Sequence, residues 1–187
     1  MKKRFVLSML AACCAAPALA DVNYSLSITQ PQHHLGNVSV EFPKSAQSHI
    51  DVKLPAWRTG RYEILNLANG VRYFAATDDN GNALKWEKIN HSTWRVHLAE
   101  PTHVNIDYQV YANELGKRAR HIDDSHAFID ASGFFMFSES FRQEPVTIDL
   151  KVPKAWRSVS GMENASNKHS FKAADYDVLV DSPIEPG

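Results

Sequence analysis

The sequence predicts an all-β protein, an antiparallel β-sandwich with at most short helical turns. Apolar and polar residues alternate in many short segments, which is the period of a strand with one buried face. Pro, Gly, Asn or Asp residues bound these segments, and helical periodicity is weak. Many short strands at this spacing favour a sandwich.

Eight segments are expected to form strands. In chain order they lie around residues 24–28, 38–42, 50–54, 71–77, 84–89, 94–98, 104–110 and 146–152. Because successive side chains of a strand point to opposite faces, each alternating segment offers one face to a core.

One turn and two short helical segments are expected between these strands. The turn lies at residues 78–82, where Asn80-Gly81 supplies the positive φ angles of a tight hairpin. Helical turns are expected within residues 59–68 and near 173–176. Neither an internal repeat nor a low-complexity tract is present, so residues 21–187 are expected to form one domain.

The first twenty residues have the features of an export signal. Lys2, Lys3 and Arg4 precede an apolar stretch over residues 5–16, and Ala18-Leu19-Ala20 supplies the small residues that a signal peptidase needs. Cleavage is expected between Ala20 and Asp21, with release to the periplasm or the extracellular space. A transmembrane anchor is not expected, because a span needs about 20 apolar residues and this run is shorter.

An alternative interpretation keeps the chain on a membrane. Residues 10–13, Leu-Ala-Ala-Cys, have the form of a lipoprotein box, in which Cys13 would carry an acyl anchor. Cys13 and Cys14 are the two cysteines of the sequence. The domain after residue 20 therefore has no disulfide, thiolate zinc site or cysteine nucleophile.

Charge gives no sign of a nucleic-acid partner. Of the 20 basic residues, 17 remain once Lys2, Lys3 and Arg4 are removed, against 21 acidic ones. The longest basic run is Lys117-Arg118-Ala119-Arg120, which is far from the basic stripe that nucleic-acid binding leaves.

The histidines are the candidate metal ligands, but no spacing among them matches a known site. His121 and His126 flank Asp123 and Asp124 in a segment that could hold a metal, yet a solvated loop with a turn-forming Asp pair is the simpler interpretation. The pair at residues 33–34 would point to opposite faces of a strand and is also assigned to a loop. We therefore expect neither a metal site nor a cofactor in this chain.

Catalytic motifs are also missing from the sequence. It contains no His-Glu-x-x-His segment, no Gly-x-Ser-x-Gly elbow and no glycine-rich phosphate loop. Two tryptophans, Trp57 and Trp156, each follow a strand and a proline. Core or rim packing is the expectation for Trp57, because its ring brings a large apolar area.

Several segments together resemble a known family. They are Leu54-Pro55-x-Trp57-x-x-Gly60-x-Tyr62, the turn before Trp86, residues 127–137, Val152-Pro153-x-x-Trp156, and Asp175 to Glu185. Their order is similar to the N-terminal domain of the glycyl aminopeptidase family, which are zinc metallopeptidases with a C-terminal PDZ domain. The similarity covers essentially all of residues 21–187, although Thr59 stands where the family usually has Pro and Asp130-Ala131 where it usually has Asn-Gly.

The resemblance implies a β-sandwich that precedes a zinc domain and a PDZ domain. No catalytic or zinc-binding residue can be carried over, so zinc is expected only in the catalytic domain and this chain alone is expected to be inactive. By analogy with related aminopeptidases the β domain would help form the substrate cleft. The candidate contacts for that role are Trp57, Arg58, Tyr62, Phe128 and Asp130.

Two interpretations of function follow. The closing segment, residues 178–187, resembles a junction, so we expect a zinc-peptidase domain to follow Gly187 and to be the partner of this one. The alternative is a stand-alone secreted β-sandwich that binds a peptide, glycan or protein, for example by adding a strand to an exposed sheet edge.

Overall fold

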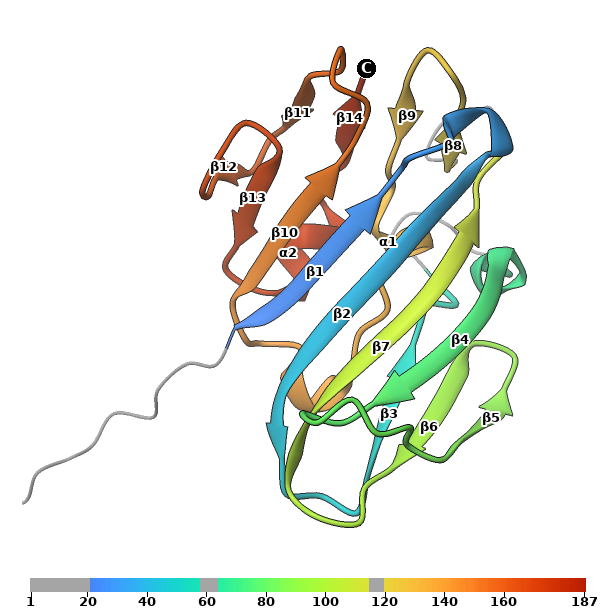
Figure 1. Cartoon of the computed structure of the whole chain (residues 1–187), viewed down its shortest axis with the longest axis vertical. Helices are drawn as coiled ribbons and strands as arrows, with labels where there is room; N and C mark the ends of the chain where they lie inside the picture. Colours follow the sequence, from blue (N-terminus) through green and yellow to red (C-terminus); the bar gives the residue numbers. More distant parts are fainter. Residues whose placement is uncertain (1–20, 58–63, 115–119) are drawn as a thin grey trace, which may run out of the picture.

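A computed structural model of the chain describes residues 21–57, 64–114 and 120–187, and most of its elements are strands (Figure 1). The strands are β1 Val22–Ser27, β2 Leu35–Ser45, β3 His49–Lys53, β4 Val71–Thr77, β5 Trp86–Asn90, β6 Thr93–His97, β7 Thr102–Tyr111, β8 His121–Ile122, β9 Ala127–Phe128, β10 Val146–Lys151, β11 Ser158–Ser160, β12 Glu163–Asn164, β13 Ser170–Ala173 and β14 Ile184–Pro186. The helices are α1 Ala131–Phe134 and α2 Tyr176–Val180, with 3-10 turns η1 Pro31–His33, η2 Leu67–Gly70 and η3 Glu139–Phe141. All eight expected strands are present, and the all-β prediction is confirmed.

The first layer is a seven-stranded sheet in the order β12-β13-β10-β1-β2-β7-β4. Its neighbours pair antiparallel except β1 and β10, which run parallel with Tyr24 opposite Ile148. The antiparallel sandwich predicted from the sequence therefore contains one parallel pair in this sheet. A parallel pair needs a long crossover connection, and here the elements from β2 to η3 supply it.

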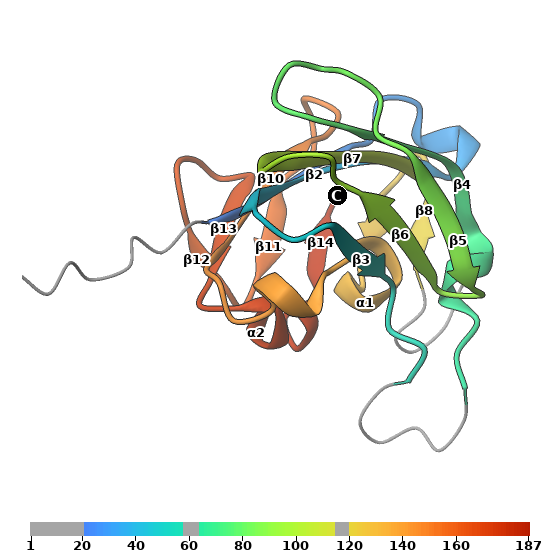
Figure 2. The ribbon, with the colours of Figure 1, turned by 90° about the horizontal axis from the view of Figure 1, so that it is seen from below.

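The second layer consists of smaller pieces on one side of this sheet. They are the three-stranded sheet β3-β6-β5, the pairs β8-β9 and β11-β14, and the two helices. Figure 2 shows α1, α2, β3 and β14 together beneath the large sheet. The hydrophobic core lies between the layers, where Leu26, Val40, Ile106 and Ile148 are fully buried.

The segment Phe134–Phe137 leads from the last residue of α1 into buried irregular backbone of the second layer. Phe134, Phe135 and Met136 have no exposed surface, and Phe137 is 6% exposed. Buried carbonyl and N–H groups are costly unless each has a hydrogen-bond partner. The partners must come from elsewhere, because this stretch joins no sheet beyond an isolated bridge between Lys53 and Phe137.

Three buried tyrosines supply those partners. The hydroxyl of Tyr108 donates to the carbonyl of Phe134 at 2.7 Å, and that of Tyr176 to Phe135 at 2.8 Å. The hydroxyl of Tyr24 donates to the carbonyl of Met136 at 2.7 Å. The Tyr108 oxygen also accepts the N–H of Met136 at 2.9 Å. Tyrosines from β1, β7 and α2 therefore hold three consecutive peptide groups between the layers.

The expected turn and one expected helix are present, whereas of the helical segment expected within 59–68 residues 59–63 lie outside the described residues and η2 begins at Leu67. Asp78 accepts the N–H groups of Asn80 and Asn82, and Gly81 has a φ of 77°. The turn closes a short antiparallel bridge between Thr77 and Ala83, beyond which β4 joins the large sheet and β5 joins β6. Residues 176–180 form the helix expected near 173–176, whereas α1 was not predicted.

The expected export signal, with the lipoprotein alternative at Cys13 and cleavage after Ala20, lies outside the described residues and stays a prediction. Asp21, on the other side of the expected cleavage point, is exposed just before β1. Within residues 21–57, 64–114 and 120–187, no helix is both long and apolar enough to cross a membrane.

Replacing Tyr108 tests the hydrogen bonds that hold Phe134–Phe137. Tyr108→Phe keeps the ring but leaves the Phe134 carbonyl and the Met136 N–H without this partner. Each orphaned buried group costs about 1–3 kcal/mol, so the free energy of unfolding should fall by roughly 2–4 kcal/mol in urea titrations. The exposed Tyr73 is the matched control, and Tyr73→Phe should change stability by less than about 0.5 kcal/mol. Equal effects of the two variants would contradict this account.

Alkaline pH tests the same tyrosines in the unchanged protein. Burial raises the pKa values of Tyr24, Tyr108 and Tyr176 above the ordinary value. Above about pH 10 the unfolded chain loses these protons while the folded chain keeps them, so stability should fall as pH rises. The free energy of unfolding, measured from pH 8 upward, should decline less steeply in Tyr108→Phe than in the parent. Parallel declines would show that Tyr108 does not contribute.

Candidate functional site

A groove of about 840 Å³ lies in the second layer, on the side away from the large sheet. Here "the groove" means the space lined by Pro55, Trp57, Phe128, Asp130, Phe137, Arg142, Tyr176, Asp177, Val180, Asp181 and Pro183. These residues come from the ends of β3 and β9, from the starts of α1 and α2, and from the segments beside Phe134–Phe137. The groove is therefore assembled from parts distant in sequence.

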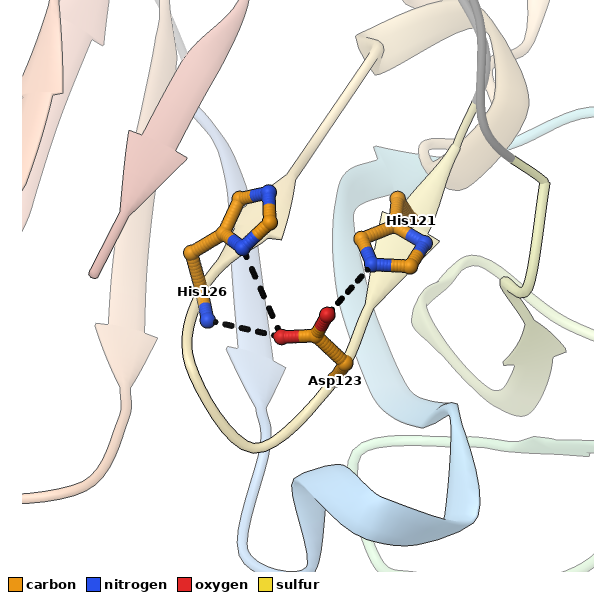
Figure 3. Close-up of side chains that lie close together, drawn as sticks. All are labelled: His121, Asp123 and His126. Carbon is orange, nitrogen blue, oxygen red and sulfur yellow. Dashed lines mark hydrogen bonds and ion pairs between the residues drawn. The ribbon is translucent and has the colours of Figure 1, made fainter.

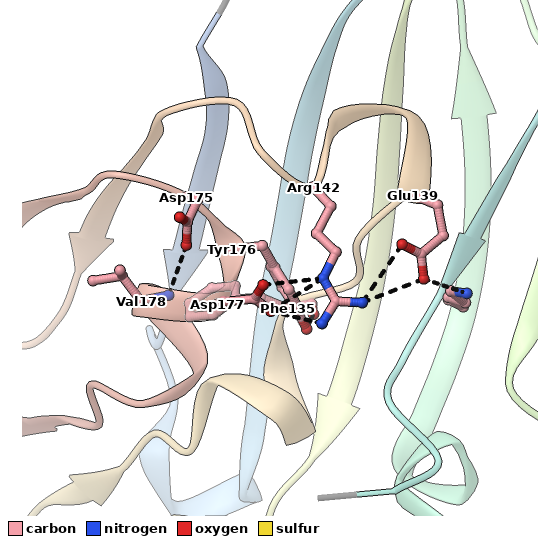
Figure 4. A network of polar contacts seen from close by, with 8 residues as sticks. Phe135, Glu139, Arg142, Asp175, Tyr176, Asp177 and Val178 are labelled. Carbon is pink, nitrogen blue, oxygen red and sulfur yellow. Dashed lines mark hydrogen bonds and ion pairs between the residues drawn. The ribbon is translucent and has the colours of Figure 1, made fainter. Parts of the chain in front are cut away.

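Its floor depends on the tyrosine-anchored segment. Phe137 stacks on Tyr176 with ring centroids 4.4 Å apart and an angle of 20° between the rings. Tyr176 begins α2, and the carboxylate of Asp175 caps this helix by accepting the N–H of Val178 at 2.8 Å (Figure 4). The N–H of Tyr176 donates to the carbonyl of Arg142 at 3.1 Å, which fixes the helix beside η3.

A row of alternating charges, here called the charged rim, runs from Lys53 through Glu139 to Arg142 and Asp177, and its last two residues line the groove (Figure 4). The Lys53 ammonium lies 2.9 Å from Glu139, and Glu139 lies 3.4 Å from the guanidinium of Arg142. Arg142 in turn donates from Nε and Nη2 to Asp177, at 3.0 and 2.7 Å. The cations of Lys53 and Arg142 also lie 5.1 and 5.4 Å from the ring centre of Phe137.

These contacts shift the pKa values of Glu139 and Arg142 in the direction that keeps both side chains charged. A hydrogen bond from Lys53 lowers the pKa of the Glu139 carboxyl, and the hydrogen bond to Asp177 raises the pKa of Arg142. Because the side chains are between 31% and 56% exposed, water screens the pairs and their net stabilisation is small. The rim is therefore a fixed pattern of charges at the surface.

The other side of the groove is aromatic and acidic. Trp57 is 55% exposed, and Phe128 is partly buried beside it in the lining. Asp130 is 8% exposed and caps α1, where its carboxylate accepts the N–H and hydroxyl of Ser132 at 3.1 and 2.7 Å. An exposed indole, a partly buried phenyl ring and lining charges that are mostly acidic can bind a surface that carries apolar and basic groups.

Three of the five contact residues proposed from sequence, Trp57, Phe128 and Asp130, thus lie together in the groove. Arg58 and Tyr62 lie outside the described residues. Of the core or rim packing expected for Trp57, the core alternative is excluded by its exposure, whereas Trp156 is only 6% exposed and belongs to the core. Sequence reasoning singled out neither Arg142 nor Phe137, since their roles depend on the neighbours that the fold brings to them.

The histidine pair at residues 33–34 does not form a site. His33 is exposed at the end of η1, and His34 hydrogen-bonds through Nδ1 to the carbonyl of Ile122 at 2.5 Å. The assignment of this pair to a turn is confirmed.

The segment from His121 to His126 forms the β8-β9 hairpin, and Figure 3 shows both imidazoles beside Asp123. The solvated-loop interpretation fits Asp124 and His126, which are exposed, but is wrong for His121, which is 6% exposed. A hydrogen bond from His121 lowers the pKa of Asp123 well below its ordinary range.

Comparison with known families gives a match over almost the whole described chain. The family described as peptidase M61 N-terminal domain matches residues 23–187. No curated protein matches the chain significantly.

Solved structures share this fold. An aminopeptidase N family protein from Idiomarina loihiensis is similar with a TM-score of 0.82 and 24% identity, over 89% of this chain and 29% of that protein. An M1 zinc metallopeptidase from Deinococcus radiodurans, bound to a Tyr-Ser-Ala substrate, has a TM-score of 0.56 and 13% identity, over 90% of this chain and 42% of its own. Yeast LTA4 hydrolase with bestatin has a TM-score of 0.54 and 10% identity, over 91% and 28%. The chain thus spans well under half of each of these proteins.

Removing one charge from the charged rim tests whether the rim contributes to the stability of the fold. Asp177→Asn removes the charge that Arg142 contacts but keeps a side chain of the same shape. Because both partners are partly exposed, the free energy of unfolding should fall by less than about 1 kcal/mol. Chemical denaturation measures this change. A loss of about 2 kcal/mol or more would show that the rim is a structural support.

Proposed function

The chain belongs to the family of peptidase M61 N-terminal domains, and from this premise we propose that it is the exported, non-catalytic N-terminal domain of a glycyl aminopeptidase-like zinc peptidase. In this proposal the groove packs on the catalytic domain and helps to shape its active-site cleft. Zinc is held by the catalytic domain, because this sequence contains no His-Glu-x-x-His motif.

The exposed indole of Trp57 is the observation that carries the proposal. Tryptophan is highly buried on average, yet 55% of this residue is open to solvent at the mouth of the groove. Exposed Trp and Arg side chains beside a hollow are typical anchors of protein interfaces. Trp57 and Arg142 are both present here, so the groove has the composition of a docking face.

The charges of the groove support a partner with basic groups. Among the described residues that line it, Asp130, Asp177 and Asp181 are acidic and Arg142 is the one cation. Arg142 is already engaged by Asp177, so the remaining excess of charge is negative. A basic patch on the catalytic domain, or the free amino group of a peptide substrate at its edge, would be complementary.

One observation favours the alternative, a stand-alone secreted sandwich that binds a peptide, glycan or protein. All five residues of β5 are exposed, and β5 is an edge strand of the sheet β3-β6-β5. Such an edge can pair with an extended peptide through its backbone groups. This interpretation needs no catalytic domain.

Trp57→Ala tests the docking face directly. The chain and the catalytic domain of the same peptidase are expressed separately, and their dissociation constant is measured by calorimetry. Truncation of an anchoring Trp costs about 2 kcal/mol or more, so the constant should rise by roughly thirtyfold or more. Tyr73→Ala is the matched control, since Tyr73 is 69% exposed on β4 of the large sheet and should leave binding unchanged. Equal constants for the parent and Trp57→Ala would overturn the proposed face.

One further measurement tests the non-catalytic role, and another separates the two interpretations. The isolated chain should release no glycine from a glycyl peptide, with or without added zinc, and zinc-dependent release would contradict the non-catalytic role. The reading frame beyond the codon of Gly187 should encode a His-Glu-x-x-His motif. A stop codon at that point would favour the stand-alone sandwich.

A further inference from the structure

The β8-β9 hairpin brings three potential metal ligands to one point. His121 lies on β8, Asp123 follows it, and His126 precedes β9 (Figure 3). One donor atom from each lies within 4.8 Å of the others. Two imidazole nitrogens and one carboxylate oxygen form a donor set suited to Zn²⁺ and related transition-metal ions.

The hairpin holds Asp123 in place through one of its two oxygens. Asp123 Oδ1 accepts the N–H groups of Ser125 and His126 at 2.8 and 2.9 Å, and the Ser125 hydroxyl at 2.7 Å. The other oxygen, Oδ2, faces His121 Nε2 at 2.9 Å. The turn therefore needs Asp123 Oδ1 alone, and Oδ2 can take a metal ion without breaking the turn.

The donor atoms lie close enough together to surround one metal ion. With metal–ligand bonds of about 2.0–2.1 Å, neighbouring donors of a tetrahedral site lie about 3.3 Å apart. His121 Nε2 and Asp123 Oδ2 are 2.9 Å apart. His126 Nδ1 lies 3.4 Å from the other oxygen of Asp123, and one donor atom from each of the three residues lies within 4.8 Å of the others. A metal ion would replace the proton that His121 and Asp123 share, and the exposed His126 side chain would turn toward it.

The exposed fraction of the side chains increases from His121 to His126, which would allow an ion to enter from solvent. The side chain of His121 is 7% exposed, that of Asp123 is 30% exposed and that of His126 is 52% exposed. The inner ligand is thus held by packing, whereas the outer one can turn toward an arriving ion. The turn is held by Asp123 Oδ1, whereas the imidazoles contact its side chains: His121 Nε2 lies 2.9 Å from Asp123 Oδ2, and His126 Nδ1 lies 2.8 Å from the Ser125 hydroxyl. A metal ion would replace both contacts.

We propose that His121, Asp123 and His126 bind one divalent transition-metal ion, with water completing its coordination. The proposal is independent of the docking groove, since none of the three residues lines it. It also revises the expectation from sequence, because the spacing alone matches no motif and the burial of His121 becomes evident only in the fold.

Calorimetric titration of the full chain with Zn²⁺ tests the site. The chain should bind one ion, and His126→Ala should weaken the binding at least tenfold, because even groups that only support ligands are worth about 10- to 100-fold in affinity. His126 is exposed, so its replacement should leave the circular dichroism spectrum unchanged. Asp123→Asn keeps an oxygen for the turn and should weaken binding similarly. Mg²⁺ should not compete, because it prefers all-oxygen ligands.

A second histidine–carboxylate pair provides the matched control. His103 Nδ1 lies 2.8 Å from Asp79 Oδ1 at the surface, and neither belongs to the three-residue cluster. His103→Ala should leave Zn²⁺ affinity within about twofold of the parent, while the visible absorption of the Co²⁺ form should be lost in His126→Ala alone. Absence of saturable Zn²⁺ binding, or an equal loss in His103→Ala and His126→Ala, would overturn the site.

Discussion

The structure depends on one constraint, which is that backbone polar groups buried in the hydrophobic core need hydrogen-bond partners. Phe134, Phe135 and Met136 lie fully buried between two layers. A backbone carbonyl without a hydrogen-bond partner would destabilise the folded state there. Tyrosine suits this position because its ring fills apolar space and its hydroxyl reaches a polar group. Three tyrosines from different elements meet three successive carbonyls, and so the second layer is bound to the first by hydrogen bonds as well as by packing.

This arrangement also explains where the candidate site lies. The segment that Tyr176 anchors continues into Phe137, whose ring forms the floor of the groove, and Tyr176 itself starts the helix that forms one wall. The groove is therefore attached to the rigid core, while its rim is built from exposed charges that add little stability. A docking face of this kind keeps its shape before a partner arrives, which lowers the entropy cost of association.

Strands were predictable from this sequence because alternation records burial directly, and β1, β2, β3, β6, β7 and β10 all show it. The parallel pairing of β1 with β10 was not predictable from the sequence. No local sequence pattern marks a parallel pair, because the pairing depends on the long connection between the two strands. The site was predictable in part. Trp57, Phe128 and Asp130 stand in family-like segments, whereas Arg142 acquires its role only from Asp177 and Phe137, which the fold brings beside it.

Hydrogen–deuterium exchange on the chain, alone and with the catalytic domain of its peptidase, tests the central claim that the groove is the docking face. The account predicts slower exchange in residues 127–130 and 176–183 when the partner is added, because these segments line the groove. Exchange around Tyr73 on the large sheet should not change. Protection confined to the large sheet, with residues 176–183 unaffected, would contradict the account.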